Sequence, residues 1–148
     1  MRVYLDACCL NRPFDDQSQE RIRLESEAVL LILGRIDVCR WEWIGSEVLD
    51  FEIAQIPDGV RRERVRHLAA HKHVFIEIRE SEVLRAKELE TIGFHVFDAL
   101  HLACAEAGSA DVFLTTDDRL VRVALHANVR LAVVVRNPLK WLAEVMKE

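Results

Sequence analysis

Two aspartates in the second half of the chain occupy positions where a carboxylate could bind a ligand. Asp98 begins a run of small apolar residues that predicts a helix to about residue 107, where a Gly-Ser pair stops it. Asp117 follows the β-forming run 111–116, and a further helix is predicted after it. Helix, strand and helix in this order indicate a parallel sheet, whose ligands gather outside the carboxyl ends of the strands. Asp117 is therefore predicted at a ligand-binding edge, whereas this argument alone leaves the position of Asp98 open.

The segment that carries both aspartates, VFDALHLACAEAGSADVFLTTDDRL over residues 96–120, resembles the second half of a PIN-domain nuclease. That family includes the VapC ribonuclease toxins. In it, a helix like the one at Asp98 and a strand end like the one at Asp117 each supply one metal-binding acid. The resemblance therefore implies that both aspartates are metal ligands.

Two earlier segments resemble the other parts of the same family, in the expected order. The opening VYLDACCLNRPFDD resembles the first strand, which ends in an acid, here Asp6. Position 8 carries Cys8, where the family more often has a small polar residue. The segment GSEVLDFEI resembles a Ser-led helix that carries the remaining acid, here Glu52. The resemblance covers essentially the whole chain and implies one PIN domain over residues 1–148.

Glu52 has two competitors on its predicted helix, Glu47 and Asp50. Spacing from Ser46 in the family pattern selects Glu52. Helical geometry favours it as well, because it places Glu52 on the partly apolar face and Asp50 with Glu47 on a more polar one. A carboxylate on the packed side of a helix needs a compensating charge, and a metal ion supplies one.

Four carboxylates cannot share one cleft in ionised form without a counter-charge. Oxygen ligands favour Mg²⁺ or Mn²⁺ over zinc, and a cation that lowers the pKa of a bound water suits metal-assisted hydrolysis of RNA phosphodiester bonds. Asp118 is an alternative to Asp117. His101, on the helical face of Asp98, is predicted to contact phosphate, to brace Asp98 or to pack in the core. The residues assigned as metal ligands and catalytic groups are Asp6, Glu52, Asp98 and Asp117.

Strands and helices alternate along the chain, which predicts a single three-layer α/β domain with a parallel five-stranded sheet. The family resemblance adds the strand order 3-2-1-4-5. Residues 7–16, which contain a proline and two aspartates, are predicted as a loop. The predicted strands are 2–6, 41–45, 74–78, 111–116 and 130–135. The predicted helices are 18–37, 46–56, 57–71, 81–93, 98–107, 119–129 and 137–148.

The composition is that of one globular domain, with 148 residues of which 51% are hydrophobic and 30% charged. The longest apolar runs are too short to cross a bilayer, and the N-terminus goes directly into a strand, so a cytoplasmic protein is predicted. Four cysteines show no metal-binding spacing and are predicted to be reduced, mostly buried thiols. These are Cys8, Cys9, Cys39 and Cys104.

The formal net charge of −5 is unexpected for a protein that binds nucleic acid, because proteins that hold a phosphate backbone by charge are usually basic. Cations bound at the carboxylates, or a local basic patch, would resolve this. The most basic segment is the predicted helix 57–71, with Arg61, Arg62, Arg64 and Arg66. We interpret it either as a solvated helix face or as a surface that binds RNA or a partner.

The resemblance to VapC toxins also implies an antitoxin partner and a homodimer. An arginine from such a partner would suit the acidic cleft, because guanidinium groups bind carboxylates in a bidentate manner. Two other functions remain open: a housekeeping PIN nuclease outside any toxin–antitoxin pair, and a PIN-like module that binds RNA or protein without cutting.

Overall fold

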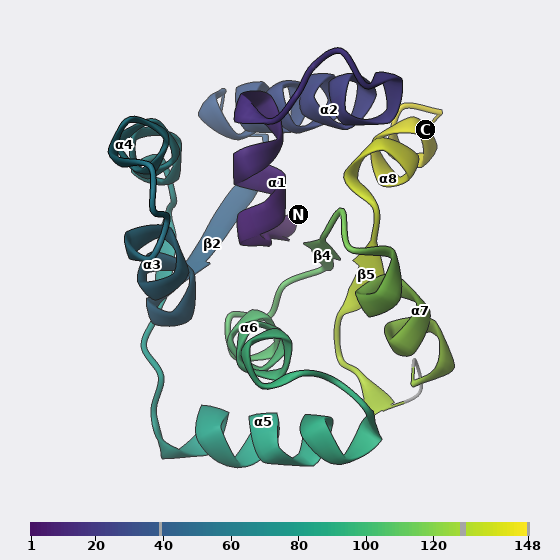
Figure 1. Cartoon of the computed structure of the whole chain (residues 1–148). Helices are drawn as coiled ribbons and strands as arrows, with labels where there is room; N and C mark the ends of the chain where they lie inside the picture. Colours follow the sequence, from purple (N-terminus) through teal and green to yellow (C-terminus); the bar gives the residue numbers. More distant parts are fainter. Residues whose placement is uncertain (39, 128–129, 148) are drawn as a thin grey trace.

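The computed structural model describes residues 1–38, 40–127 and 130–147, and a single parallel sheet lies at its centre (Figure 1). The order across the sheet is β3-β2-β1-β4-β5, and every neighbouring pair is parallel. Both the α/β class and the strand order expected from the sequence are confirmed. The strands are β1 Arg2–Leu5, β2 Glu42–Ser46, β3 Val74–Ile76, β4 Val112–Leu114 and β5 Val134–Arg136.

Helices cover both faces of the sheet and complete three layers (Figure 1). The first set, α1, α2, α4 and α8, packs on one face, and α5, α6 and α7 pack on the other. The short helix α3 follows β2 and contributes to both cores. The helices are α1 Ala7–Asn11, the 3-10 helix η1 Arg12–Phe14, α2 Glu20–Asp37, α3 Glu47–Ala54, α4 Gly59–Ala69, α5 Glu80–Ile92, α6 Val96–Ala107, α7 Asp118–His126 and α8 Pro138–Val145.

The central strand β1 fixes the position of the site. Val3 and Leu5 point into the core under α2 and α8, whereas Tyr4 points into the core under α6. All three side chains are fully buried, as the alternation of a strand between two covered faces requires. The strand that ends at Asp6 is therefore held on both faces and by both neighbouring strands.

The predicted loop over residues 7–16 was wrong in its first part, because α1 and η1 follow β1 directly. Asp6 caps α1 by accepting a hydrogen bond from the Ala7 backbone amide, and Cys9 and Leu10 are buried in the core. Pro13 lies in the first turn of η1, where its missing N–H leaves no bond unmade. Helical structure therefore begins immediately after the first predicted acid.

The last strand is shorter than predicted, since β5 covers Val134–Arg136 instead of 130–135. It is the edge strand next to β4, and Val134 is about half exposed, so the strand is not fully buried. The helix predicted over 119–129 is observed as Asp118–His126, and residues 128–129 lie outside the described residues.

Cys8, Cys9 and Cys104 are free thiols, as predicted, and Cys39 lies outside the described residues. Within the described ranges, no helix is both long enough and apolar enough to span a membrane.

Candidate metal site

Asp6 lies at the carboxyl end of β1, beside the end of β4. Its backbone amide donates to the Leu114 carbonyl at 2.9 Å, which joins the two strand ends. Its carboxylate accepts one hydrogen bond from the Ala7 amide at 2.8 Å and another from Thr115 Oγ1 at 2.9 Å. Since the side chain is also buried, its orientation is fixed before any ligand binds.

Cys8 contacts this carboxylate directly, although its sulfur replaces the polar group that is more usual at this position. Its Sγ lies 3.5 Å from Asp6 Oδ2 and 3.3 Å from Thr115 Oγ1, and it accepts a hydrogen bond from the Thr116 amide. The thiol therefore links the first turn of α1 to the segment after β4.

Glu52 reaches the same place from α3. The helix begins at Ser46, whose Oγ accepts from the Leu49 amide at 3.1 Å, as the sequence predicted for this N-cap. Glu52 Oε1 lies 2.6 Å from Nε2 of His101 on α6, and the same nitrogen lies 3.8 Å from Asp6 Oδ1. Asp6, Glu52 and His101 each offer one ligand atom within 4.8 Å of the other two.

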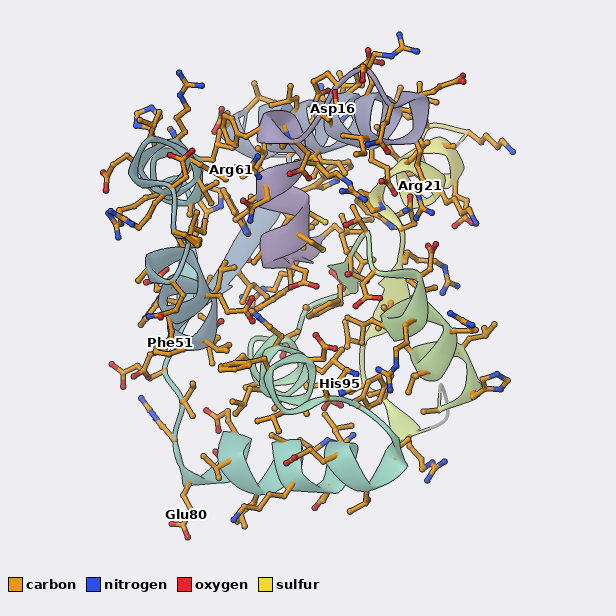
Figure 2. All side chains as sticks on the ribbon, in the orientation of Figure 1. Asp16, Arg21, Phe51, Arg61, Glu80 and His95 are labelled. Atoms are coloured by element: carbon orange, nitrogen blue, oxygen red, sulfur yellow. The ribbon has the colours of Figure 1, made fainter. Side chains whose placement is uncertain are left out.

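The two alternative acids point elsewhere and form ion pairs. Asp50 is exposed and accepts from Lys72 Nζ at 2.7 Å. Asp118 is bound by both terminal nitrogens of Arg21 (labelled in Figure 2), at 2.7 and 2.8 Å, so the pair joins α2 to α7. That hydrogen-bonded pair lowers the pKa of Asp118.

Asp98 lies in the first turn of α6, one turn before His101. Its pKa is raised to about 6, first by burial and then by the charges of Asp6 and Asp117, although His101 and His95 act in the opposite direction. The dependence on Asp6 and Asp117 shows that the three carboxylates share one electrostatic environment.

Asp117 is exposed and caps α7, with Oδ1 accepting from the amides of Arg119 and Leu120. The structure thus gives it the capping role that an aspartate at a helix start often has. Of the four acids predicted as ligands, Asp6 and Glu52 form the tight group with His101, and Asp98 and Asp117 lie at its margin.

A buried chain of hydrogen bonds supports Glu52 from behind. Nδ1 of His101 lies 2.6 Å from the Tyr4 hydroxyl, which lies 2.6 Å from Ser46 Oγ. Burial by itself lowers the pKa of His101, but the hydrogen bond to Glu52 and the nearby charges of Asp6 and Asp98 raise it overall. The protonated ring therefore offsets part of the carboxylate charge.

The sequence did not predict this partner of His101. Two of the three roles considered are observed: His101 packs in the core against Tyr4 and Phe113, and it braces a carboxylate, although that carboxylate is Glu52 and not Asp98. The available signal was a single histidine among small apolar residues on α6. Its partners Tyr4 and Glu52 lie 97 and 49 residues earlier, so only the fold brings them together.

The comparisons with known proteins agree with this geometry. A family model described as PIN domain matches residues 3–125, a range that includes all four predicted acids. The chain belongs to the PIN domain family. The resemblance seen in the sequence is thereby confirmed.

A chain in the crystal structure of VapBC2 from Rickettsia felis bound to a DNA fragment from their promoter has a similar fold. The two share 13% sequence identity and a TM-score of 0.54, over 93% of this PIN domain and 98% of that chain. No curated protein sequence matches this one.

The donor atoms of this PIN domain fit a divalent cation. Two carboxylates and an imidazole nitrogen each offer one ligand atom within 4.8 Å of the other two. Carboxylate oxygens suit Mg²⁺ and Mn²⁺, and an imidazole nitrogen is better suited to Mn²⁺ than to Mg²⁺. Nε2 of His101 lies 2.6 Å from Glu52 Oε1 and 3.8 Å from Asp6 Oδ1, so both carboxylates approach the same ring nitrogen.

We expect His101→Leu to lower the free energy of unfolding of the metal-free protein by about 3 kcal/mol, because it leaves Glu52 and Asp6 without their buried counter-charge. Leucine has a similar size, so the loss reports charge and hydrogen bonding more than cavity formation. Urea denaturation at neutral pH in the presence of a chelator measures it. His67→Leu, at an exposed position of α4, is the control and should change stability by less than about 0.5 kcal/mol. Equal stability of both variants would show that His101 only fills space.

Proposed function

We propose that this PIN domain is a metal-dependent endoribonuclease that hydrolyses RNA phosphodiester bonds. The observation that carries the proposal is the convergence of Asp6, Glu52 and His101, with Asp98 beside them, at the carboxyl ends of β1 and β4. Membership of a nuclease family supports the reaction class. The ends of parallel strands are also where ligands of such sheets bind.

In the proposed site, Asp6, Glu52 and Asp98 would hold Mg²⁺ or Mn²⁺, and Asp117 would reach it directly or through water. The bound cation would supply positive charge and lower the pKa of a water molecule that attacks phosphorus. Thr115 and the Ala7 amide keep Asp6 oriented, and His101 does the same for Glu52. Asp117, at the exposed margin, would orient the attacking water.

The test combines binding and activity. We expect Mn²⁺ at a hundredfold excess over its dissociation constant to stabilise the protein by about 2.7 kcal/mol, which raises the melting temperature by about 5 to 11 °C. Cleavage of an unpaired RNA should require Mg²⁺ or Mn²⁺ and stop on addition of a chelator. Asp6→Asn should abolish both effects, whereas the control Asp118→Asn should retain them because Asp118 pairs with Arg21. Undiminished cleavage by Asp6→Asn, or in chelator, would refute the proposal.

As part of the same proposal, the protein acts as the toxin of a VapBC-type pair, with an antitoxin partner, and forms a homodimer. The similar fold of a chain from the VapBC2 complex supports the toxin role and the antitoxin partner. A basic side chain from the partner would offset the same carboxylate repulsion that a cation offsets, so partner and cation would compete. A short reading frame beside this gene would support the pairing.

A further inference from the structure

The helix α4 is the most basic segment of the sequence, but several of its arginines already form hydrogen bonds or ion pairs within the protein. Arg61 extends toward α1 and η1, where it donates to Asp15 at 2.7 Å (Figure 2). Arg62 donates to a backbone carbonyl, and Arg66 forms an ion pair with Glu63. These groups hold the fold together, so most of α4 is a poor candidate for binding a phosphate backbone.

A different group of basic side chains surrounds a pocket of about 310 Å³ between α7 and the end of α5. Arg119, His126 and Arg130 line it, together with apolar side chains and Gly93, and no carboxylate belongs to the lining. The volume is within the range of small ligand sites. In a chain of net charge −5, this pocket is a local concentration of positive charge and N–H donors.

These donors remain available for a ligand. Arg119 Nη2 donates to the Gly93 carbonyl at 3.2 Å, which holds the guanidinium against the pocket wall and leaves its other N–H groups unused by that bond. Among the ion pairs of the described residues, none involves Arg119, His126 or Arg130.

Two segments of chain connect the pocket to the carboxylate cluster, by which we mean Asp6, Glu52, Asp98 and Asp117 of the proposed site. The amide of Arg119 donates to the Asp117 carboxylate at 2.9 Å, so one wall of the pocket begins at a residue of the cluster. On the other wall, Gly93 ends α5 only five residues before Asp98. Both walls of the pocket therefore include a residue within five positions of an acid of the proposed site.

We propose that this pocket binds a backbone phosphate of the RNA strand whose scissile phosphate lies at the carboxylate cluster. The inference rests on the proposed ribonuclease function and adds to it a site for holding the substrate. Such a site adds an attraction for the phosphate backbone that the cluster lacks, because the carboxylates repel phosphate unless a cation is present. Two guanidinium groups beside one pocket provide the bidentate donors that phosphate oxygens accept.

Binding of a fluorescein-labelled, unpaired 12-nucleotide RNA, measured by anisotropy in chelator over a range of salt concentrations, isolates the pocket from the metal-dependent cluster. We expect Arg119→Gln/Arg130→Gln to weaken binding about tenfold or more. The slope of log affinity against log salt should fall by about 0.7, because the pocket neutralises one phosphate and each neutralised phosphate of a single strand adds about 0.7 to the slope. The matched control is Arg23→Gln/Arg64→Gln, which removes the same charge from exposed positions of α2 and α4.

Equal losses in the two double variants, or a larger loss in the control, would overturn the pocket assignment. The pocket assignment is also refuted if the Arg119→Gln/Arg130→Gln variant loses binding to an acidic partner protein but binds RNA as well as the parent does. A parent protein that cleaves RNA with Mn²⁺, while both variants bind it equally, would keep the nuclease proposal and refute the pocket. A parent protein that binds RNA through the pocket but cleaves it with no divalent cation would keep the pocket and refute the nuclease proposal.

Discussion

Replacing Glu52 by glutamine is expected to reduce the rate of RNA cleavage by about three orders of magnitude or more, although the folded structure should persist. Glutamine keeps the size of the side chain and can still bond His101, but it removes the negative charge that a cation requires. A loss of several kcal/mol in metal-assisted stabilisation corresponds to a loss of this size in rate. Initial rates on a fluorogenic RNA in saturating Mn²⁺ measure it.

Asp50→Asn provides the matched control, since it lies two residues earlier on the same helix and removes the same charge. Its carboxylate is bound by Lys72 and faces away from Asp6, so its loss should leave most of the activity. An inactive Asp50→Asn variant together with an active Glu52→Gln variant would show that α3 presents the other acid to the substrate.

Asp98→Asn is expected to have opposite effects on stability and on function. The folded protein holds the pKa of Asp98 at about 6, about two pH units above its ordinary value, so the ionised carboxylate destabilises the metal-free fold. At about 1.4 kcal/mol per pH unit, and after allowance for its partial exposure, we expect Asp98→Asn to stabilise the metal-free protein by about 2 kcal/mol at pH 7.5. The melting temperature should then rise by about 4 to 8 °C.

The stability gained by Asp98→Asn should depend on pH. Below about pH 4, Asp98 is protonated in both the folded and unfolded states and costs nothing. Between about pH 4 and pH 6, the unfolded chain loses the proton before the folded one, so the stability of the parent falls relative to Asp98→Asn. The advantage of the variant should therefore be absent near pH 4 and complete above pH 6.

Thermal melts in chelator across this range measure the advantage of Asp98→Asn, and saturating Mn²⁺ should reverse the order because only the parent retains the full site. A variant that gains no stability at pH 7.5, or gains as much at pH 4, would show that Asp98 is not under repulsion from the cluster. A Mn²⁺ shift equal to that of the parent would remove Asp98 from the proposed ligands.

The sequence predicted the features of this fold that depend on short segments. Ser46 at the start of α3 and the Gly-Ser stop after α6 are local signals, and both act as predicted. The alternation of strands and helices indicated a parallel sheet, but the strand order came from the family resemblance. The choice of Glu52 over Asp50 followed from the family spacing after Ser46 together with helical geometry, and the structure places Glu52 and not Asp50 beside Asp6.

Features that depend on long-range contacts were missed for a physical reason. The sequence of residues 7–16 has the proline and acids of a loop, but burial of Cys9 and Leu10 under α2 favours a helix there. The arginines of α4 were a candidate RNA surface in the sequence, because the acceptors that bind Arg61 and Arg62 lie on other segments and cannot be recognised from α4 alone. Likewise, His101 forms its hydrogen bond with Glu52 and not with Asp98 because α3 and α6 meet at the ends of β2 and β1.

The bond between Asp6 and Thr115 joins residues 109 positions apart, and this separation has a consequence for the protein while it is being made. Synthesis proceeds from the N-terminus, so β1 emerges well before its neighbour β4. A growing chain that stops before α6 carries Asp6 and Glu52 but neither Asp98 nor Asp117. Under the proposed function, the cutting site therefore does not exist on the ribosome until the segments from α6 to Asp117 have been made, and chains that stop before them cannot attack the RNA that encodes them.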